Sequence, residues 1–283
     1  MTKIIAKRIR KKGISGILVD AVLYLFALIS VIPFVILFFN TFKDKDHIYN
    51  ALYMPNFLYT ENYQKIFEKT DVLGALSNTI LICFATQLLM VLFASAAGYV
   101  ISRSREKIFK FVYLLFVSGL IIPSQTNMIV IYKLGVALHM INTIPFLIMI
   151  YVSGSTAFAT LIYVGFTKTI PREIEESAGM DGCGRYGLFA RIIFPLLMPA
   201  TGTVLVTTIF WFWNDFSGPL IYLNDKRYQT IIMAIFNFSL DSRSTDWGPV
   251  FALCFIASLP MIALFLFTQK YLLKGLTSGA VKG

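Results

Sequence analysis

The chain has 283 residues, of which 57% are hydrophobic and 14% are charged, whereas an ordinary soluble domain has about 25% charged residues. These proportions exclude a soluble fold, and the 26 Phe, 14 Tyr and 3 Trp exclude a disordered chain. The net charge of +10 does not by itself indicate nucleic-acid binding, because basic loops on one side of a membrane protein have the same effect. The three cysteines are scattered and the two histidines have no nearby ligand residues, so we expect no disulfide framework and no metal site.

Apolar stretches long enough to cross a bilayer recur along the chain. A membrane-spanning helix needs about 20 mostly apolar residues. Stretches of this kind run over residues 17–39, 75–100, 109–131, 144–166, 192–213 and 250–269. The first follows six basic residues, but it is too long for a signal peptide and lacks an Ala-x-Ala cleavage site, so we expect an uncleaved anchor. The sequence therefore predicts an all-α, polytopic membrane protein with six transmembrane helices.

The basic residues indicate which side of the membrane each loop faces. An even number of spans places both termini on one side, and that side carries 17 of the 25 Lys and Arg residues. The loops of the other side carry the remaining eight, together with nine acidic residues. By the positive-inside rule, both termini are expected in the cytoplasm. Because topology explains the net charge, we expect no nucleic-acid partner.

The chain divides naturally at the segment after the first span. We expect residues 1–72 to hold the cytoplasmic N-terminus, the anchoring helix and the first outer loop, and residues 73–274 to form a block of five spans. Residues 275–283 would form a short cytoplasmic tail. Within the first part, residues 42–72 alternate aromatic and charged side chains, which is typical of a surface loop with short helical pieces.

The spans lack the groups that would drive transport or catalysis. Apart from Asp20 and Lys110, each near the end of its stretch, none of the six stretches contains a carboxylate or basic residue, although a gradient-driven carrier would need such groups near the bilayer centre. Amides such as Gln87 and Asn127 do not titrate and more often join helices. No nucleophile with its base, paired carboxylates or metal cluster stands out, and residues 182–187 match G-x-G-x-x-G without the strand and acidic residue of a dinucleotide site. The energy source is therefore expected in another chain.

The loop between the fourth and fifth spans, residues 169–191, has the features of a short helix outside the membrane. Pro171 suits a first helical turn, and Ile174 and Ala178 fall four residues apart on one face. Three carboxylates complement the positive end of the helix dipole: Glu173, Glu175 and Glu176. Four glycines are expected to end the helix and form a compact turn: Gly179, Gly182, Gly184 and Gly187.

This loop resembles the EAA loop of binding-protein-dependent ABC importer permeases. The pattern is Glu-Ala-Ala, three residues, Gly, nine residues, Ile, one residue and Leu-Pro, and its places are held here by Glu176, Ala178, Gly182, Ile192 and Pro195. Two departures keep small or apolar character: Ser177 for the middle Ala and Phe194 for Leu. The resemblance implies that the helix docks in a cleft of a separate cytoplasmic ATPase subunit. The alternative is an ordinary amphipathic connecting loop.

Further segments resemble the sugar branch of that superfamily, the maltose and multiple-sugar permeases of the inner membrane. They are residues 142–143, 180–182, 213–216 and the ending 274–283. This resemblance implies the type I ABC importer permease fold, with six transmembrane helices and a cytoplasmic EAA coupling helix, in the bacterial cytoplasmic membrane. It implies no catalytic residue, no metal and no cofactor in this chain, with ATP and Mg bound by the partner ATPase.

The resemblance also implies three groups of functional residues. The ATPase-coupling loop would comprise Glu175, Glu176, Ser177, Ala178, Asp181, Gly182, Ile192 and Pro195. The tail that reaches the ATPase would comprise Gly275, Leu276, Thr277, Gly279 and Ala280. Pathway or substrate contacts are expected among Gln87, Asn127, Trp213, Asn214 and Asp215, although an aromatic belt at the interface is the simpler explanation of the tryptophan.

The function implied is that of a permease subunit of an ATP-driven importer of oligosaccharides or monosaccharides, forming half of the translocation pathway. Its partners would be a second homologous permease, a cytoplasmic ABC ATPase dimer, an extracytoplasmic sugar-binding protein and membrane lipid. The alternatives are an ABC importer permease for amino acids, peptides or polyol phosphates, a secondary carrier, and a membrane-embedded enzyme. ATP hydrolysis is not expected in this chain.

Overall fold

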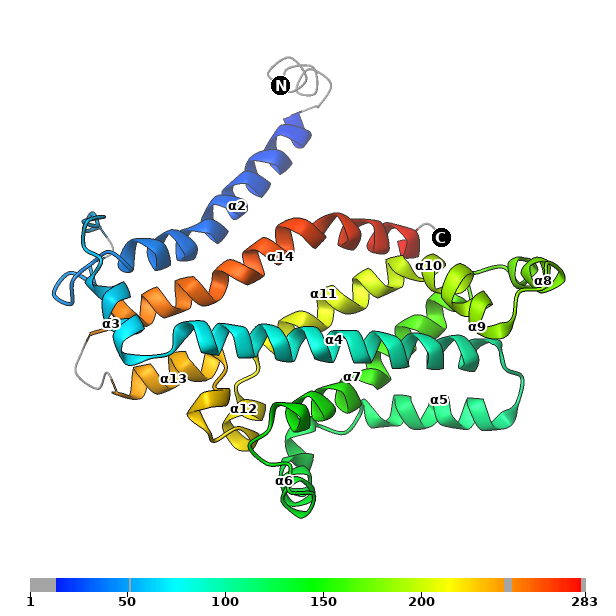
Figure 1. Ribbon diagram of the computed structural model, residues 1–283. Coiled ribbons are helices and arrows are strands. Elements are labelled where there is room, and N and C mark those ends of the chain that lie inside the picture. Colours follow the sequence, from blue (N-terminus) through cyan, green and yellow to red (C-terminus); the bar gives the residue numbers. More distant parts are fainter. Residues whose placement is uncertain (1–13, 51, 242–245, 281–283) are drawn as a thin grey trace. The chain divides into compact units, whose positions relative to one another are not determined.

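The computed structural model describes residues 14–50, 52–241 and 246–280, and throughout these ranges the secondary structure is helical (Figure 1). The longer helices are α2 (Ile14–Asn40), α4 (Val72–Arg103), α5 (Lys107–Gly119), α7 (Ile144–Thr167), α11 (Met198–Asn214), α13 (Ile231–Asp241) and α14 (Gly248–Ala280). The short α-helices are α3 (Glu61–Lys69), α6 (Met128–Ala137), α8 (Arg172–Met180), α9 (Arg185–Leu188), α10 (Phe194–Leu196) and α12 (Ser217–Tyr222). Two 3₁₀ turns, η1 (Ser124–Asn127) and η3 (Lys226–Tyr228), and a π-helical turn, η2 (Phe189–Ile193), complete the set.

The chain forms two compact units. One consists of the residues up to Lys69 together with Phe238–Ile256, and the other of Thr70–Asn237 together with the residues from Ala257 onward. The first unit thus contains α2, α3 and the beginning of α14. The second contains α4 to α12, most of α13 and the remainder of α14.

Within the described ranges, four helices are long and apolar enough to cross a membrane: α2 over Leu18–Asn40, α4, α7 and α14 over Gly248–Thr268. A fifth crossing is available if Arg185–Leu196 and Met198–Asn214, which meet at a 68° bend, form one span. The stretch over 192–213 is therefore bent at Leu197 and is not one straight helix. A π-helical turn ends at Ile193, one turn of helix before the bend, and such turns are frequent where helices deviate and at functional sites.

The expected continuous helix over residues 109–131 is wrong. α5 ends at Gly119, and a break containing Pro123 separates it from η1 and α6. Proline lacks an amide hydrogen and disfavours helical geometry in the residue before it, so the apolar run cannot remain one helix. The sixth expected span, residues 250–269, is shorter than the observed helix, because the backbone of α14 continues as helix to Ala280.

The core of the second unit is built on close packing between α4 and α7, which lie side by side with α5 in Figure 1. Gly98 of α4 makes this approach possible, because a Cβ atom there would lie 2.5 Å from the Cβ of Tyr163. The Tyr163 hydroxyl donates to Thr201 Oγ1 at 2.9 Å, which attaches α11 to α7. Small residues at helix contacts and interhelical hydrogen bonds are what hold helices together in lipid.

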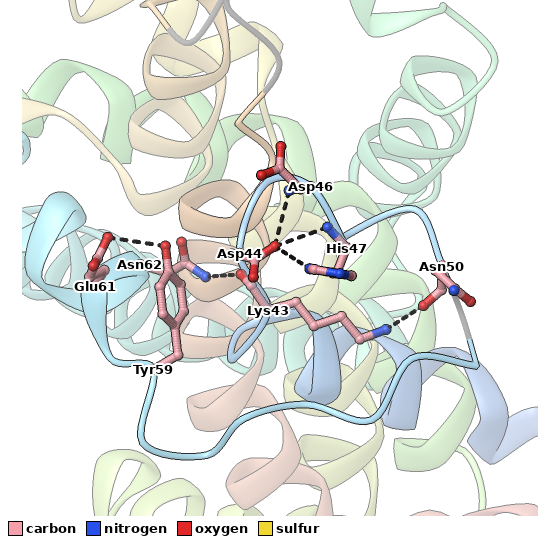
Figure 2. A network of polar contacts seen from close by, with 8 residues as sticks. All are labelled: Lys43, Asp44, Asp46, His47, Asn50, Tyr59, Glu61 and Asn62. Carbon is pink, nitrogen blue, oxygen red and sulfur yellow. Dashed lines mark hydrogen bonds and ion pairs between the residues drawn. The ribbon is translucent and has the colours of Figure 1, made fainter.

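The first unit contains a polar network between the end of α2 and the start of α3 (Figure 2). Asn62, which is completely buried, donates its amide hydrogens to the carbonyls of Thr41 and Lys43 at 2.9 and 2.8 Å. The Lys43 ammonium donates to the Asn50 carbonyl at 2.8 Å, and burial lowers the pKa of Lys43. The prediction of a loop with short helical pieces in residues 42–72 is confirmed by this arrangement and by α3.

Candidate functional site

α8 ends in a Schellman motif, which defines the geometry of the loop between α7 and α11. The amide of Cys183 donates to the Ala178 carbonyl at 3.0 Å, and the amide of Gly182 donates to the Gly179 carbonyl at 3.1 Å. This pattern requires a left-handed residue just after the helix, and Gly182 supplies it with a φ of +80°. Of the four glycines expected to end the helix, only Gly182 does so. Gly179 and Gly187 lie inside helices, and Gly184 is the N-cap of α9.

The outer surface of this loop combines acidic and apolar side chains. Glu176, Ser177 and Asp181 are exposed, and Met180 and Tyr186 are 89% and 94% exposed. An exposed apolar pair next to carboxylates is typical of a surface that a partner covers.

The apolar strip expected from the helical spacing does not lie on this surface. Ala178 is buried within the chain at 7% exposure, whereas Ile174 is 37% exposed. The residues that could have indicated this exposed surface from the sequence are Met180 and Tyr186, because large apolar residues beside a glycine turn have little room to be buried locally.

Glu175 faces the interior of the second unit and contacts the end of α4. Its carboxylate accepts a hydrogen bond from the Tyr99 hydroxyl at 2.9 Å and forms an ion pair with Arg103 Nε at 2.5 Å. Arg103 also donates through Nη2 to the Ile170 carbonyl at 2.8 Å. The side chains of Glu175 and Arg103 are each 15% exposed. Sequence reasoning missed Tyr99 and Arg103, and the only signal for them was the arginine at the end of an apolar span.

The two remaining loop positions lie at the entry to the bent helix. Ile192 belongs to the π-helical turn and is half-buried, whereas its neighbour Ile193 is completely buried. Pro195 lies in α10 and is exposed, two residues before the 68° bend. The loop residues and the bend are thus adjacent in the fold.

A cavity of about 560 Å³ in the second unit contains two of the five expected pathway residues, Asn127 and Asp215. The Tyr151 hydroxyl donates to Asp215 Oδ2 at 2.7 Å, and the amides of Ser217 and Gly218 donate to the same carboxylate, each at 3.1 Å. The ring of Tyr151 stacks on Phe212, with centroids 5.2 Å apart.

Further polar and aromatic groups line this cavity, among them Gln125, Ser153 and Trp211. Aromatic faces beside hydroxyl, amide and carboxylate groups can contact the apolar and hydroxyl parts of a polar solute.

The other three expected pathway residues lie elsewhere. Gln87 and Trp213 line a second, almost wholly apolar cavity of about 460 Å³. The Gln87 amide donates to the Leu205 carbonyl at 2.9 Å, and its oxygen accepts from Thr208, so this residue joins α4 to α11. Asn214 is exposed and donates to the Phe210 carbonyl of its own helix.

For the expected tail contacts, the structure describes only the backbone. Gly275, Leu276, Thr277, Gly279 and Ala280 belong to the last turns of α14, and their side chains lie outside the described structure. Residues 281–283 lie outside the described ranges altogether. Among the described residues, no three His, Cys, Asp or Glu side chains are grouped closely enough to hold a metal ion.

Comparison with known proteins identifies the family. Residues 90–278 match the model for "Binding-protein-dependent transport system inner membrane component". The chain belongs to this family. The match includes α8, its glycine turn, the bent helix and the cavity that contains Asn127 and Asp215. It also shows that the protein is a multi-pass protein of the inner membrane and a transport subunit.

Individual relatives are similar over nearly their whole length. The chain is 34% identical to the melibiose/raffinose/stachyose import permease protein MelC of Bacillus subtilis, over 89% of this chain and 91% of that one. It is 32% identical to the multiple sugar-binding transport system permease protein MsmG of Streptococcus mutans, over 90% and 93% of the two chains. These relatives place the protein among the ABC importer permeases that handle carbohydrates, which confirms the sequence interpretation.

Solved structures agree on the fold. A chain of a bacterial ABC transporter involved in the import of the acidic polysaccharide alginate superposes with a TM-score of 0.77 at 18% identity, covering 91% of this chain and 96% of that one. The protein therefore has the permease fold of an ABC importer.

Proposed function

We propose that this protein is one permease subunit of an ATP-driven sugar importer and forms half of its translocation pathway. The observation that carries the proposal is the 34% identity to a melibiose/raffinose/stachyose permease over 89% of the chain. Relatives for starch degradation products and for arabinooligosaccharides, at 31% and 29% identity, support the same solute class. The solute would therefore be a sugar, with short oligosaccharides favoured over amino acids, peptides or polyol phosphates.

The surface of α8 and its turn would dock on a separate ATPase. Exposed Met180 and Tyr186 supply apolar contact area, and Glu176 and Asp181 supply charge complementary to a basic groove. Docking here would transmit closure of the ATPase dimer to the adjacent bend at Leu197. The last turns of α14 would contribute a second contact with the ATPase.

The polar cavity of about 560 Å³ would form part of the sugar pathway. Tyr151 and Asp215 present a hydroxyl and a carboxylate oxygen for sugar hydroxyls, and Trp211 presents a ring face. Among the residues first expected in the pathway, Asn127 and Asp215 retain this role, whereas Gln87 serves helix packing.

The proposed topology has six crossings with both termini in the cytoplasm. α2, α4, α7, the bent helix and α14 supply five of them. The broken segment α5–η1–α6 would supply the sixth, because its interruption lies beside the polar cavity, where backbone groups freed by Pro123 can be hydrated. The 17 basic residues on the terminal side support this orientation.

The complete importer would contain a second homologous permease, two ATPase subunits that bind ATP and Mg, and an extracytoplasmic sugar-binding protein. A structurally similar alginate transporter has been solved with an alginate pentasaccharide-bound periplasmic protein, which supports a binding-protein partner here.

The test is ATP-dependent sugar uptake by the complex that co-purifies with this chain, reconstituted in lipid vesicles with its binding protein. Raffinose, melibiose, maltotriose, an amino acid mixture and a dipeptide are offered as labelled solutes. We expect uptake of at least one sugar that requires ATP and ceases when the ATPase is omitted. Uptake of the amino acids or the dipeptide alone would reject the sugar assignment, and uptake by the purified chain without ATP would reject the importer.

A further inference from the structure

The contact between Glu175 and the end of α4 gives the coupling helix an attachment inside the protein. Glu175 precedes the EAA-like residues, yet its carboxylate is directed to Tyr99 and Arg103 and not to the exposed face of α8. A carboxylate that is 15% exposed and already holds two partners is poorly placed to bind a separate protein. Its neighbour Glu176 is exposed. The two adjacent acids therefore have different roles.

Arg103 joins both ends of the segment that leads into α8. Through Nε it pairs with Glu175 on α8, and through Nη2 it donates to the carbonyl of Ile170, in the connection between α7 and α8. A guanidinium is a planar donor whose nitrogens are fixed relative to one another, so it holds two acceptors in a defined geometry. Because Arg103 is the last residue of α4, this geometry attaches α8 to α4.

Tyr99 extends the attachment to the bent helix. Its hydroxyl donates to Glu175, and its ring lies 5.6 Å from the ring of Phe189, the first residue of the π-helical turn. The residue before it on α4, Gly98, packs directly against Tyr163 of α7. The end of α4 is thus in contact with α7, α8 and η2.

We propose that Tyr99 and Arg103 are positioning residues which, through Glu175, transmit movement of α8 to α4. This proposal rests on the proposed function, since it concerns how docking of the ATPase reaches the helices that line the pathway. Without these contacts, α8 would be attached through the short connection at residues 168–171 and through its own glycine turn. A displacement of α8 would then be absorbed by rotation of these connections. With the contacts, α4 must follow.

The experiment compares Glu175→Gln, Arg103→Gln and the double variant in the reconstituted complex, with Glu173→Gln as matched control. Glu173 is an exposed carboxylate on the same helix. We expect each single variant to lower sugar transported per ATP hydrolysed about tenfold and the double variant to fall far less than the product of the two losses, because both changes remove the same Arg103–Glu175 ion pair. Glu173→Gln should transport like the wild type. Multiplication of the two losses to about a hundredfold would overturn the proposal.

A second measurement separates transmission from docking. Met180→Cys, at an exposed position of α8, is cross-linked to the ATPase in a background without the native cysteines. The proposal requires the cross-linking yield to be the same with Glu or Gln at position 175, while transport per ATP differs. A yield that falls with Glu175→Gln would make Glu175 a docking residue and overturn the proposal.

Tyr99→Phe provides a milder variant in case the glutamine variants fail to assemble. It removes the hydroxyl bond to Glu175 and keeps the ring beside Phe189. We expect transport per ATP to fall about threefold, as for one lost hydrogen bond of modest strength. Unchanged coupling in an assembled Tyr99→Phe complex would overturn the role of Tyr99. Failure of the wild-type complex to take up any sugar would instead reject the proposed function.

Discussion

Substitution of Gly182 isolates the contribution of backbone conformation to the loop between α7 and α11. Gly182 has a φ of +80°, and no atom lies within 4 Å of the position that a Cβ would occupy. Gly182→Ala therefore meets no steric clash with other parts of the described structure. Its whole effect comes from forcing an L-residue into the left-handed region, where the Cβ approaches the following carbonyl oxygen.

The magnitude follows from this conformational cost. The left-handed region costs an L-residue about 1–2 kcal/mol, which lowers the population of the correctly formed turn by a factor of about 5 to 30. The bonds at stake are those from the amides of Gly182 and Cys183 to the carbonyls of Gly179 and Ala178. Gly182→Asn should lose less, because asparagine tolerates this region better than alanine.

Two assays measure the loss. ATP-dependent raffinose uptake, or uptake of whichever sugar the wild-type complex accepts, gives the functional effect per amount of assembled complex. Amide hydrogen exchange of the segment around Gly182 gives the structural effect. Gly184→Ala is the matched control, since Gly184 also has open space around it but a φ of −68°. Gly182→Asp differs from Gly182→Asn chiefly in charge, so any difference in sugar-stimulated ATP hydrolysis between the two measures the effect of one additional negative charge at the docking surface.

We expect uptake to decrease in the order wild type, Gly182→Asn, Gly182→Ala, with Gly184→Ala close to wild type. The reasoning is refuted if Gly182→Ala and Gly184→Ala show the same uptake and the same hydrogen exchange. Faster exchange in Gly182→Ala with full uptake would show that the turn is weakened but that coupling does not depend on it.

Three further predictions concern stability, measured as Tm of the purified protein. Gly98→Ala should lower the free energy of unfolding by about 1–3 kcal/mol, because the added methyl group overpacks the contact of α4 with α7. Gly165→Ala, in open space on α7, should leave the free energy of unfolding unchanged. Equal Tm values for the two variants would contradict this prediction. Asn62→Ala should cost about 1–3 kcal/mol for each buried carbonyl left without a donor, and an unchanged Tm would show that water replaces the amide. Lys65→Met should cost below about 1 kcal/mol, because the ion pair with Asp246 is partly exposed. The hydrogen bond to Asp246 raises the pKa of Lys65 above 10.5. The difference in stability between wild type and Lys65→Met should therefore be constant below pH 10.5 and disappear as the pH rises further. A stability difference that grows with pH would refute this prediction.

The long helices were predictable because their signal is local. The apolar stretches at 17–39, 75–100 and 144–166 correspond to α2, α4 and α7, since a run of about 20 apolar residues without charge has few other stable states in a membrane. The same count failed at 109–131. There the apolar character of the run concealed the effect of Pro123 on the backbone.

The candidate site was predictable where it depends on neighbouring residues and not where it depends on distant ones. The start of α8 at Arg172 and its end at Met180, before the Gly182 turn, follow from proline, acidic residues and glycine within one short segment. The direction of Glu175 does not, because its partners lie 76 and 72 residues earlier in the chain. Likewise, Asn127 and Asp215 are distant in the chain, so their shared cavity was not predictable. The use of Gln87 to join α4 to α11 was not predictable either.

The sequence by itself determined that the protein is membrane-embedded and all-helical, with a short acidic helix between its fourth and fifth apolar stretches, because composition, run length and local capping act over a few turns of chain. Its assignment as a permease came from the resemblance of the segment around Glu176 and Gly182 to the EAA loop. Only the tertiary structure decided that α8 is attached to α4 through Arg103, that the helix after it is bent at Leu197, and which polar residues share a cavity. Helix faces are assigned by packing, and packing brings together residues whose separation in the sequence carries no information about their contact.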